Sequence, residues 1–411
     1  MRKRHERQKA MKRMFSFSLA AGLASLAGAA TISEMNVAFD AETKIARITY
    51  SLDEPSIVMM TVKTNGIALA ESQTAHAVGD VRRKVAAGPG EIFWATDRDV
   101  NGILEGGFTV ELTPWSPKEP PEVMVVDLQL ANNFTFYRSV EGLPDGGLAN
   151  DRYRTDVLVM KKIPMKGVTF LCGNPTSTSE RFKPFLCTFT NDYYFGIYPV
   201  TQAQSILVTG ERDSEPTEDP EALLRPVDKI NWIGVRYWNS WPPVDHSGLS
   251  TNGRLGKFQQ LGLNFDIPTG AQWEYACRAG TQGTRYDDDL DAIAWYNGNS
   301  TNVLSGQIET HPVGRKKPNA FGLYDMLGNV SEWTLDWFRS VELTDRDQVR
   351  VDYPGPNGPE SGTYQAAKTK RSGSCKSSAS DISASFYNNY NLNSDPVMGH
   401  GYRLCVSAEL P

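Results

Sequence analysis

The sequence predicts an α+β protein, in which a small all-β sandwich domain precedes a larger domain of short helices and long loops. At 411 residues, the chain is long enough for two or three domains. Residues 31–120 contain short runs of β-branched and aromatic residues separated by turn residues. Four prolines within residues 114–121 then indicate a stiff connector. The second half is rich in Gly, Asn, Pro and Ser, which favours irregular loops around a few capped helices.

The first thirty residues have the layout of an export signal. Seven basic side chains precede an apolar run from Met14 to Ala27, and small residues continue to Ala30. The run is short and rich in Gly, Ala and Ser, so it does not suit a membrane-spanning helix, although an uncleaved signal anchor is the alternative. We therefore expect residues 1–30 to be a signal peptide, with no transmembrane segment after its removal. The expected destination is the periplasm, the cell surface or the extracellular space.

The charge of the expected mature chain argues against nucleic acid as a partner. The whole sequence has a formal net charge of −6, and residues 1–29 hold seven basic and one acidic side chain, so their removal leaves −12. A negative protein repels phosphate backbones. No basic block or basic helix follows residue 30.

Residues 31–120 are predicted to form an immunoglobulin- or fibronectin-like sandwich. Thr64–Asn65–Gly66 predicts a tight hairpin turn between two strands. Trp94 is expected in the core, because aromatic side chains dominate sandwich interiors. The sequence shows no catalytic cluster here. The expected strands are 44–50, 57–63, 91–94 and 108–112.

Residues 121–162 are predicted to be a linker with connecting strands, at 123–127 and 157–160. The domain of residues 163–411 follows, with three helices expected. Thr201 can cap a helix through Val208, and Asn231 can cap a helix carrying several aromatic residues, namely Trp232, Tyr237, Trp238 and Trp241. Thr269 and Gln272 form a capping box for a helix ending near Arg278, with Gly280 as its stop.

Residues 319–337, NAFGLYDMLGNVSEWTLDW, combine turn glycines, oxygen ligands and tryptophans. Carboxylates at Asp325 and Glu332, with carbonyls exposed by a turn at Gly328, suit calcium, which takes six to eight oxygens in flexible geometry. A surface turn followed by a short amphipathic helix is the alternative from composition alone.

This stretch resembles the signature of the sulfatase-modifying-factor family, whose founding members are the formylglycine-generating enzymes. Further blocks agree in order: 195–204 (FGIYPVTQAQ), 267–281 (IPTGAQWEYACRAGT), 311–314 (HPVG), 371–374 (RSGS) and 401–404 (GYRL). The resemblance implies that residues 163–411 adopt a formylglycine-generating-enzyme-like fold, a variant of the C-type-lectin architecture.

The resemblance also implies a calcium site. Asp325 and Glu332 would supply side-chain ligands, and Gly328 and Val330 would supply backbone oxygens. A second family site would fall near Asn297, where the following loop departs from the enzymes. Ca²⁺ is therefore the expected cofactor.

Residues 370–382 bear on the family's oxidase chemistry. In formylglycine-generating enzymes this block carries two cysteines, five residues apart, which hold Cu(I) and take part in oxidising a substrate cysteine. Alignment places Ser377 and Ile382 at those positions, and neither can replace a thiolate on Cu⁺. Cys375 lies two residues before Ser377 and is the one catalytic candidate, so Cu⁺ is not expected.

Iron is not expected either, because Fe²⁺ sites of the facial type need two histidines and a carboxylate. His311 and His400 with Asp325 could be imagined in that role, but no paired placement is visible. In iron-dependent relatives the ligands come largely from a separate helical domain, which this chain lacks.

The five cysteines, all in the second half, leave at least one thiol unpaired in an oxidising compartment. Cys172 and Cys187 flank a loop between two strand-like runs, and are one candidate pair. The resemblance implies Cys277–Cys405 as another, since some members tie this helix to the terminal strand. Spacing alone leaves the connectivity open.

Three classes of function remain. The first is an exported, calcium-stabilised binding module for a peptide, glycan or protein partner, with His311, Ser377 and Arg403 as groove candidates. The second is a formylglycine-generating-type or non-haem metal oxidoreductase, and the third is a structural cell-envelope protein. Arg403 is expected to make a buried ion pair or contacts with the backbone, because a lone arginine in a strand needs a partner. The tryptophans at 273, 333 and 337 are expected in the core.

Overall fold

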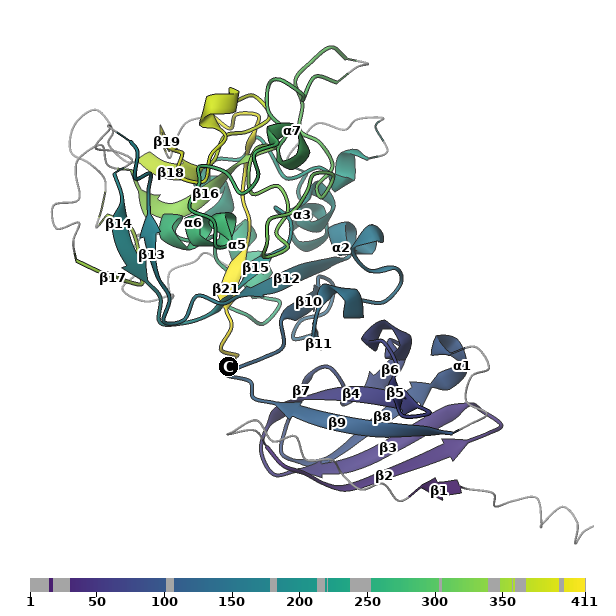
Figure 1. The fold of residues 1–411 in the computed structure, drawn as a ribbon. Coiled ribbons are helices and arrows are strands. Elements are labelled where there is room, and N and C mark those ends of the chain that lie inside the picture. Colours follow the sequence, from purple (N-terminus) through teal and green to yellow (C-terminus); the bar gives the residue numbers. More distant parts are fainter. Residues whose placement is uncertain are drawn as a thin grey trace, which may run out of the picture. The chain divides into compact units, whose positions relative to one another are not determined.

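The chain forms two compact units, which comprise Met1–Val123 with Thr135–Ala149 and Glu409–Pro411, and Met124–Phe134 with Asn150–Ala408 (Figure 1). The computed structural model describes residues 15–17, 30–100, 107–177, 183–212, 219, 221–236, 253–302, 305–338, 348–356, 358, 367–391 and 395–410. Residues 121–162 are divided between both units. Strand β11 (Phe134–Tyr137) spans the sequence boundary between them.

The described residues of the first unit form two antiparallel sheets and one short α-helix, α1 (Thr96–Asp99). The first sheet has the order β1-β2-β3-β8-β6, and in the second sheet β4 pairs with β5, β7 and β9. The strands are β1 (Phe15–Phe17), β2 (Ile32–Asp40), β3 (Ile45–Leu52), β4 (Ser56–Thr64), β5 (Ile67–Ala68), β6 (Ala77–Gly79), β7 (Lys84–Val85), β8 (Gly88–Ala95) and β9 (Phe108–Trp115).

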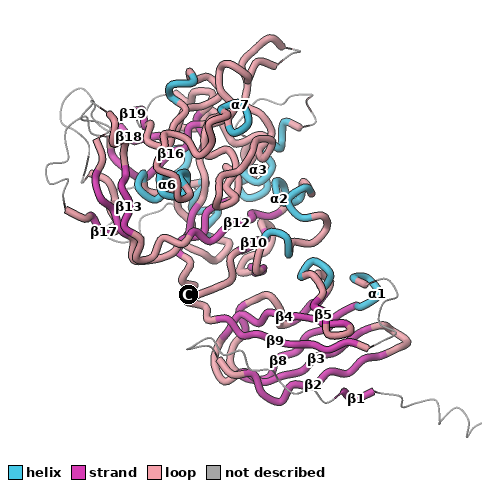
Figure 2. Tube along the Cα trace, viewed as in Figure 1, coloured by secondary structure: helices cyan, strands magenta, loops and turns pink. Residues whose placement is uncertain are grey.

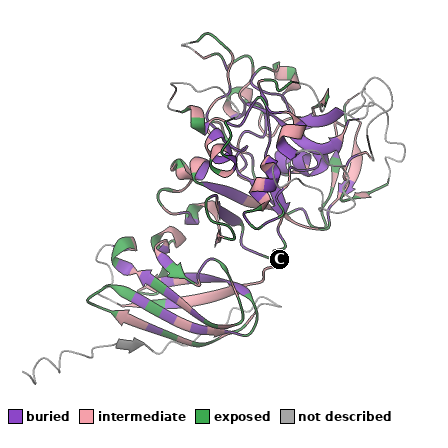
Figure 3. Cartoon of the chain, turned by 180° about the vertical axis from the view of Figure 1, so that it is seen from behind, coloured by how far each residue is buried: buried purple, intermediate pink, exposed green. Residues whose placement is uncertain are grey.

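Residues from both sheets form one apolar core in this unit. Along β3 and β8 buried residues alternate with more exposed ones, as the banded strands of Figure 3 show. Trp94 of β8 is fully buried and meets Phe108 of β9 edge-on, with ring centroids 5.5 Å apart. The prediction that Trp94 is a core residue is confirmed.

The hairpin predicted at Thr64–Gly66 is present between β4 and β5. Asn65 and Gly66 have φ values of 51° and 78°, as the two central residues of a type I′ turn require. Strand β9 runs further than predicted, through Pro114, which pairs with Val58 of β4. Proline is tolerated there because its missing N–H can face away from the single pairing partner.

The second unit has three small sheets, and loops make up most of it (Figure 2). The sheet orders are β11-β10-β12-β15-β21, β13-β14-β17 and β19-β18-β16-β20. The strands are β10 (Val123–Asp127), β12 (Val157–Ile163), β13 (Thr169–Cys172), β14 (Phe185–Thr188), β15 (Tyr193–Gly196), β16 (Ser331–Trp337), β17 (Arg350–Val351), β18 (Ala367–Arg371), β19 (Tyr387–Asn391), β20 (His400–Gly401) and β21 (Cys405–Ser407). The helices are α2 (Arg152–Thr155), α3 (Gln202–Thr209), α4 (Trp232–Arg236), α5 (Arg254–Gln259), α6 (Gly270–Arg278) and α7 (Leu290–Ile293).

The predicted helix starts at Thr201 and Thr269 are confirmed, and each threonine forms a capping box with the residue three positions later. Asn231 accepts a hydrogen bond from Gly234 N–H at 2.7 Å, which fits its predicted capping role. The left-handed residue that ends α6 is Ala279, at φ 45°, one residue before the predicted glycine stop. Tyr237, Trp238 and Trp241 lie outside the described residues.

Residues 319–337 form a series of turns and a strand, and the alternative of an amphipathic helix is wrong. Gly322, Asp325, Gly328 and Asn329 all have positive φ, from 52° to 79°, which no helix accommodates. The chain then enters β16, which pairs with β18 and β20. Trp333 is fully buried there.

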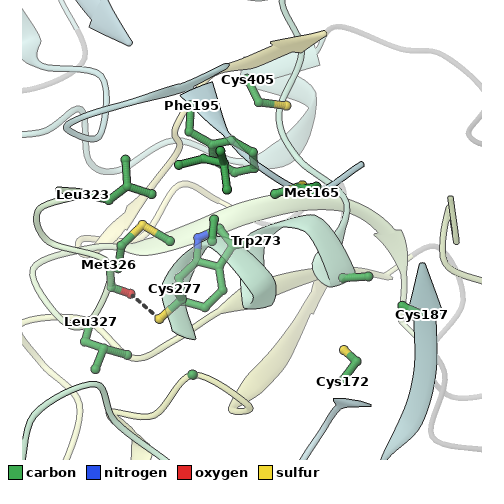
Figure 4. Packing of buried hydrophobic residues seen from close by; sticks show 14 of the residues in the cluster. Met165, Cys172, Cys187, Phe195, Trp273, Cys277, Leu323, Met326, Leu327 and Cys405 are labelled. Atoms are coloured by element: carbon green, nitrogen blue, oxygen red, sulfur yellow. Dashed lines mark hydrogen bonds between the residues drawn. The ribbon is translucent and has the colours of Figure 1, made fainter. Parts of the chain in front are cut away.

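Helix α6 is the centre of the second unit's core. Trp273 packs with Phe195, Leu323 and Met326 in one buried cluster (Figure 4). Burial of a large aromatic side chain contributes on the order of 2–3 kcal/mol, so this packing is a major contribution to the stability of a unit with little regular structure.

Most of the predicted signal peptide lies outside the described residues. Its described segment Phe15–Phe17 pairs with β2. Among the residues that are described, no helix combines the length and apolar character needed to cross a bilayer.

The capping box of α6 gives a stability prediction. Thr269 Oγ1 accepts from Gln272 N–H at 3.2 Å, and Gln272 Oε1 accepts from Thr269 N–H at 2.9 Å. Thr269→Ala should lower the free energy of unfolding by about 1 kcal/mol, measured by urea denaturation. Thr269→Ser, which keeps the hydroxyl, should lose much less, and equal losses in both variants would contradict the role of the cap.

Candidate functional site

A buried ion pair between Glu332 of β16 and Arg403 organises the middle of the second unit. Arg403 is fully buried and its Nη2 lies 2.8 Å from Glu332 Oε1. Arg403 Nε lies 3.2 Å from both carboxylate oxygens, and Trp273 Nε1 donates to Oε2 at 2.6 Å. The remaining guanidinium N–H groups donate to the carbonyls of Gly196, Ile197 and Tyr324, at 2.7–2.9 Å. Every part of this buried arginine therefore has an acceptor.

This pairing bears on the predicted calcium site. Both oxygens of Glu332 are already used by Arg403 and Trp273, and the arginine supplies the positive charge expected from the metal. Asp325 Oδ2 accepts from Gly314 N–H at 2.7 Å, and burial raises the pKa of Asp325 to about 6. The predicted carboxylates therefore do not fit calcium, which requires several free oxygen ligands at one point.

The other residues of the predicted calcium set have different roles. Gly328 lies against the backbone of Trp295, where an added Cβ would come within 2.3 Å of the Trp295 oxygen. Val330 is buried, and an added Cβ on Gly401 would lie 2.9 Å from its Cγ2. Asn297 is exposed, and its N–H donates to Ser377 O at 3.0 Å. A close contact with the Trp295 backbone therefore explains the glycine at 328, and packing against Gly401 explains the valine at 330.

Asn329 joins three loop segments at the candidate site. It is fully buried at φ 58°, and its N–H donates to Trp295 O at 2.8 Å. Its side-chain amide accepts from His311 N–H and donates to His311 O, both at 3.0 Å. Its carbonyl accepts from Cys375 N–H at 3.0 Å. A single asparagine, through its backbone and its side-chain amide, thus positions the loops that carry Trp295, His311 and Cys375.

Ser377 and Ile382 converge on Gly373. A Cβ added to Gly373 would lie 2.7 Å from Ser377 Cβ and 2.7 Å from Ile382 Cδ1. Ser377 Oγ also accepts from Ser374 N–H at 2.9 Å, which closes this loop on itself. The two positions are therefore neighbours, and neither side chain offers a thiolate to Cu(I).

Cys375 is buried beside these residues, and its thiol is not activated. Burial raises the pKa of Cys375 to about 12, with Asp228 adding to the effect. A protonated thiol is a poor nucleophile and a poor metal ligand.

His311 and Lys316 lie on opposite faces of Trp295. The His311 and Trp295 ring centroids are 3.8 Å apart with 17° between the planes, and Lys316 Nζ is 3.8 Å from the indole centroid. Two groups at that distance cannot share one face of the ring. Burial, followed by Arg225 and Lys316, lowers the pKa of His311 to about 4, so its imidazole is neutral at physiological pH. Buried His311 Nε2 has no partner among the described residues.

Of the predicted groove residues, only His311 and Ser377 lie next to these loops. Arg403 differs from the groove prediction, because all its donors are directed into the core. Its predicted need for a buried partner is confirmed. The sequence analysis did not single out Trp295 and Lys316. The available signals were that Trp295 precedes Asn297 by two residues and that Lys316 follows the 311–314 block by two residues.

All five cysteines are free and buried, so neither predicted disulfide is present. In the β13–β14 register Cys187 is opposite Phe170 and Cys172 is opposite Phe185, a diagonal placement. Diagonal residues are roughly 7–8 Å apart, beyond the usual Cα separation of a disulfide. Figure 4 shows Cys277 and Cys405 on opposite sides of Trp273 and Phe195. Cys172 Sγ instead donates to Glu274 Oε2 at 3.0 Å.

The imagined iron ligands are not gathered into a site. Across the described ranges, no group of three His, Cys, Asp or Glu side chains is arranged to hold a metal ion. His400 of β20 contacts Lys370 of β18, and His311 stacks on Trp295.

Comparison with known proteins relates most of the second unit to one family. A model of the sulfatase-modifying factor enzyme 1-like domain matches residues 156–408. The chaperone protein LppX of Paenibacillus barcinonensis is 28% identical over 185 residues, which cover 37% of this chain and 65% of that protein. A formylglycine-generating enzyme of Streptomyces coelicolor is 36% identical over 118 residues, covering 26% of this chain and 35% of the enzyme. The chain thus spans between about a third and two thirds of these relatives.

Among solved structures, Treponema denticola variable protein 1 matches with a TM-score of 0.46 and 26% identity. The match covers 61% of this chain and 95% of that one.

The Glu332–Arg403 pair should behave as one unit in a double-mutant cycle. Glu332→Met or Arg403→Met alone should cost about 3–5 kcal/mol, because each leaves a buried charge without a partner. The double variant should cost clearly less than the sum, measured by urea denaturation. Additive losses would show that the two charges are not coupled.

The pair also predicts the response to metal removal. EDTA should leave the melting temperature unchanged, because Arg403 already neutralises the carboxylate that calcium would need. A fall in melting temperature that calcium, but not magnesium, reverses would restore the predicted calcium site.

Proposed function

The chain belongs to the sulfatase-modifying factor enzyme 1-like family, and from that premise we propose that its second unit is a binding domain for a peptide or protein partner. In this proposal the domain does not perform copper-dependent oxidation. The protein is exported, the domain is a variant of the C-type-lectin architecture, and the N-terminal sandwich is a spacer or second binding surface.

The observation that carries the proposal is the pair of side chains on either side of Gly373. The backbone brings residues 377 and 382 together, as a two-thiolate site requires, but the side chains are a hydroxyl and an aliphatic chain. The nearby thiol of Cys375 is buried and protonated. The two positions are close together, but they offer no ligands for Cu(I).

The adjoining surface offers groups for recognition. Trp295 is held between His311 and Lys316, and the Asn297–Ser377 hydrogen bond joins this surface to the loop of residues 371–382. A half-buried indole with a neutral imidazole and an ammonium group can bind apolar, donor and acceptor groups of a peptide together. A relative named as a chaperone is in keeping with protein binding.

The alternative is an oxidase, which the formylglycine-generating relatives support equally by similarity. The two proposals differ at residues 377 and 382. Copper binding at these positions therefore decides between them.

Cu(I) affinity should be measured by competition with a colorimetric chelator under anaerobic conditions. Wild-type protein should not compete, and Ser377→Cys/Ile382→Cys should bind stoichiometric Cu(I), because its two thiolates would flank Gly373. Ser377→Ala/Ile382→Val is the matched control without thiols. A cysteine-containing peptide incubated with wild-type protein, copper and oxygen should lose no more thiol than in a protein-free control, as followed by mass spectrometry. Copper binding or enzymatic loss of that thiol in the wild type would overturn the proposal.

A further inference from the structure

Strand β18 carries a buried amine whose described neighbours include no acidic partner. All five residues of β18 are buried, and Lys370 is 5% exposed. Lys370 Nζ lies 2.5 Å from His400 Nε2 on β20. Among the described residues, no carboxylate pairs with this amine. Buried lysines are almost always paired with an acidic group, so the site is incomplete as it stands.

The groups around Lys370 form an aromatic box. Its Nζ is 4.7 Å from the ring centroid of Tyr390 on β19 and 5.6 Å from that of Trp333 on β16. His400 meets both rings edge-on, with centroids 4.8 Å and 5.8 Å away. The aromatic faces stabilise an ammonium ion that lies against them, but they do not replace a negatively charged partner.

His400 supplies a second polar atom that lacks a partner. When Lys370 is an ammonium group it can only donate, so His400 Nε2 then accepts and the proton of the neutral ring is on Nδ1. Nδ1 is buried and has no hydrogen-bond partner among the described residues, and His400 as a whole is 8% exposed. The pair therefore presents two kinds of donor and no matching acceptor.

We propose that Lys370 and His400, inside the box formed by Trp333 and Tyr390, are a binding site for the carboxylate group of a ligand. A carboxylate accepts hydrogen bonds only and carries the missing negative charge, so it satisfies both requirements of the site. The ligand carboxylate comes from a peptide C-terminus or from a small organic acid. This site is separate from the Ser377 loop and does not depend on binding there.

Tyr390 is the entry side of the box. Strand β19 is the edge strand of its sheet, and Tyr390 is half-buried, whereas Trp333 is fully buried and its Nε1 donates to Ile230 O at 2.9 Å. A ligand reaches Lys370 by displacing the Tyr390 ring, and Trp333 remains as the fixed wall.

Carboxylate binding at this site takes up a proton. Burial lowers the pKa of Lys370 to about 7, and burial followed by Lys370 lowers the pKa of His400 to about 3. The titratable groups facing the amine are His400 from β20 and Tyr390 from β19, while β16 contributes the indole of Trp333. Above pH 7 the amine is mostly neutral, and a bound anion stabilises the ammonium form, so protonation accompanies binding.

The test uses thermal melting of the full chain at pH 6.5 with sodium acetate, triglycine or triglycine amide, each against sodium chloride at equal ionic strength. Acetate or triglycine should raise the melting temperature of the wild type, and triglycine amide, which has no carboxylate, should not. A larger shift with triglycine identifies a peptide C-terminus, and a larger shift with acetate identifies a small acid. No shift beyond chloride with either carboxylate would overturn the proposal.

Two lysines of β18 provide matched variants. Lys370→Met should abolish the carboxylate-dependent shift. Lys368→Met should retain it, because Lys368 is equally buried but donates to Leu335 O at 2.8 Å and lies over Trp337. A retained shift in Lys370→Met, or a shift lost equally in both variants, would refute the site.

A measurement on the wild type alone covers the case in which Lys370→Met does not fold. Calorimetric titration of acetate at pH 8 in two buffers of different ionisation enthalpy should give different heats, since a proton is taken from the buffer. At pH 6, where Lys370 is mostly protonated, the difference should shrink. Buffer-independent heats at pH 8 would contradict an ammonium–carboxylate contact.

Discussion

The buried pair of Glu332 and Arg403 is the constraint on which the second unit depends. A guanidinium group without water must have an acceptor for each donor, and here these acceptors are one carboxylate and three backbone carbonyls. The carbonyls come from two segments far apart in the sequence, and the carboxylate is also bound by Trp273 of α6. Loops with little regular structure are thereby joined at one point, and the cost of leaving either charge alone makes the arrangement specific.

A second buried network positions the loop beyond β18. Glu274 of α6 pairs with Arg278 and Arg371, and Arg371 also donates to Ala384 O at 2.7 Å. Asn329 binds the backbone of the same loop at Cys375. These contacts act together with the Ser377 hydroxyl, which accepts from Ser374 N–H, and with buried Ile382 to set the path of residues 371–384.

The buried cations of β18, together with Arg403, differ in the groups that balance their positive charge. Arg371 has a carboxylate and Arg403 has another, and Lys368 has a backbone carbonyl and a carboxylate, Asp336, whose charge favours its ammonium form. Lys370 faces aromatic rings and a neutral imidazole. Of these four described cations, Lys370 is the one without a carboxylate partner, and this difference is a better indication of a ligand site than a single exposed residue.

Local patterns in the sequence determined the capped helices, the Asn65–Gly66 turn, the core position of Trp94 and the family blocks, because each depends on residues close in the chain. The alignment of Ser377 and Ile382 with the family's two cysteine positions also came from such a block, whereas their approach around Gly373 was seen only in the structure. The sequence alone could not show that Glu332 serves Arg403 rather than calcium, that Cys172 and Cys187 are diagonal rather than opposite, or that Lys370 meets His400. Those outcomes depend on strand register and on contacts between residues that are 15 to 71 positions apart in the sequence. A carboxylate pairs with the cation that lies next to it in the folded protein, and tertiary packing determines which cation that is.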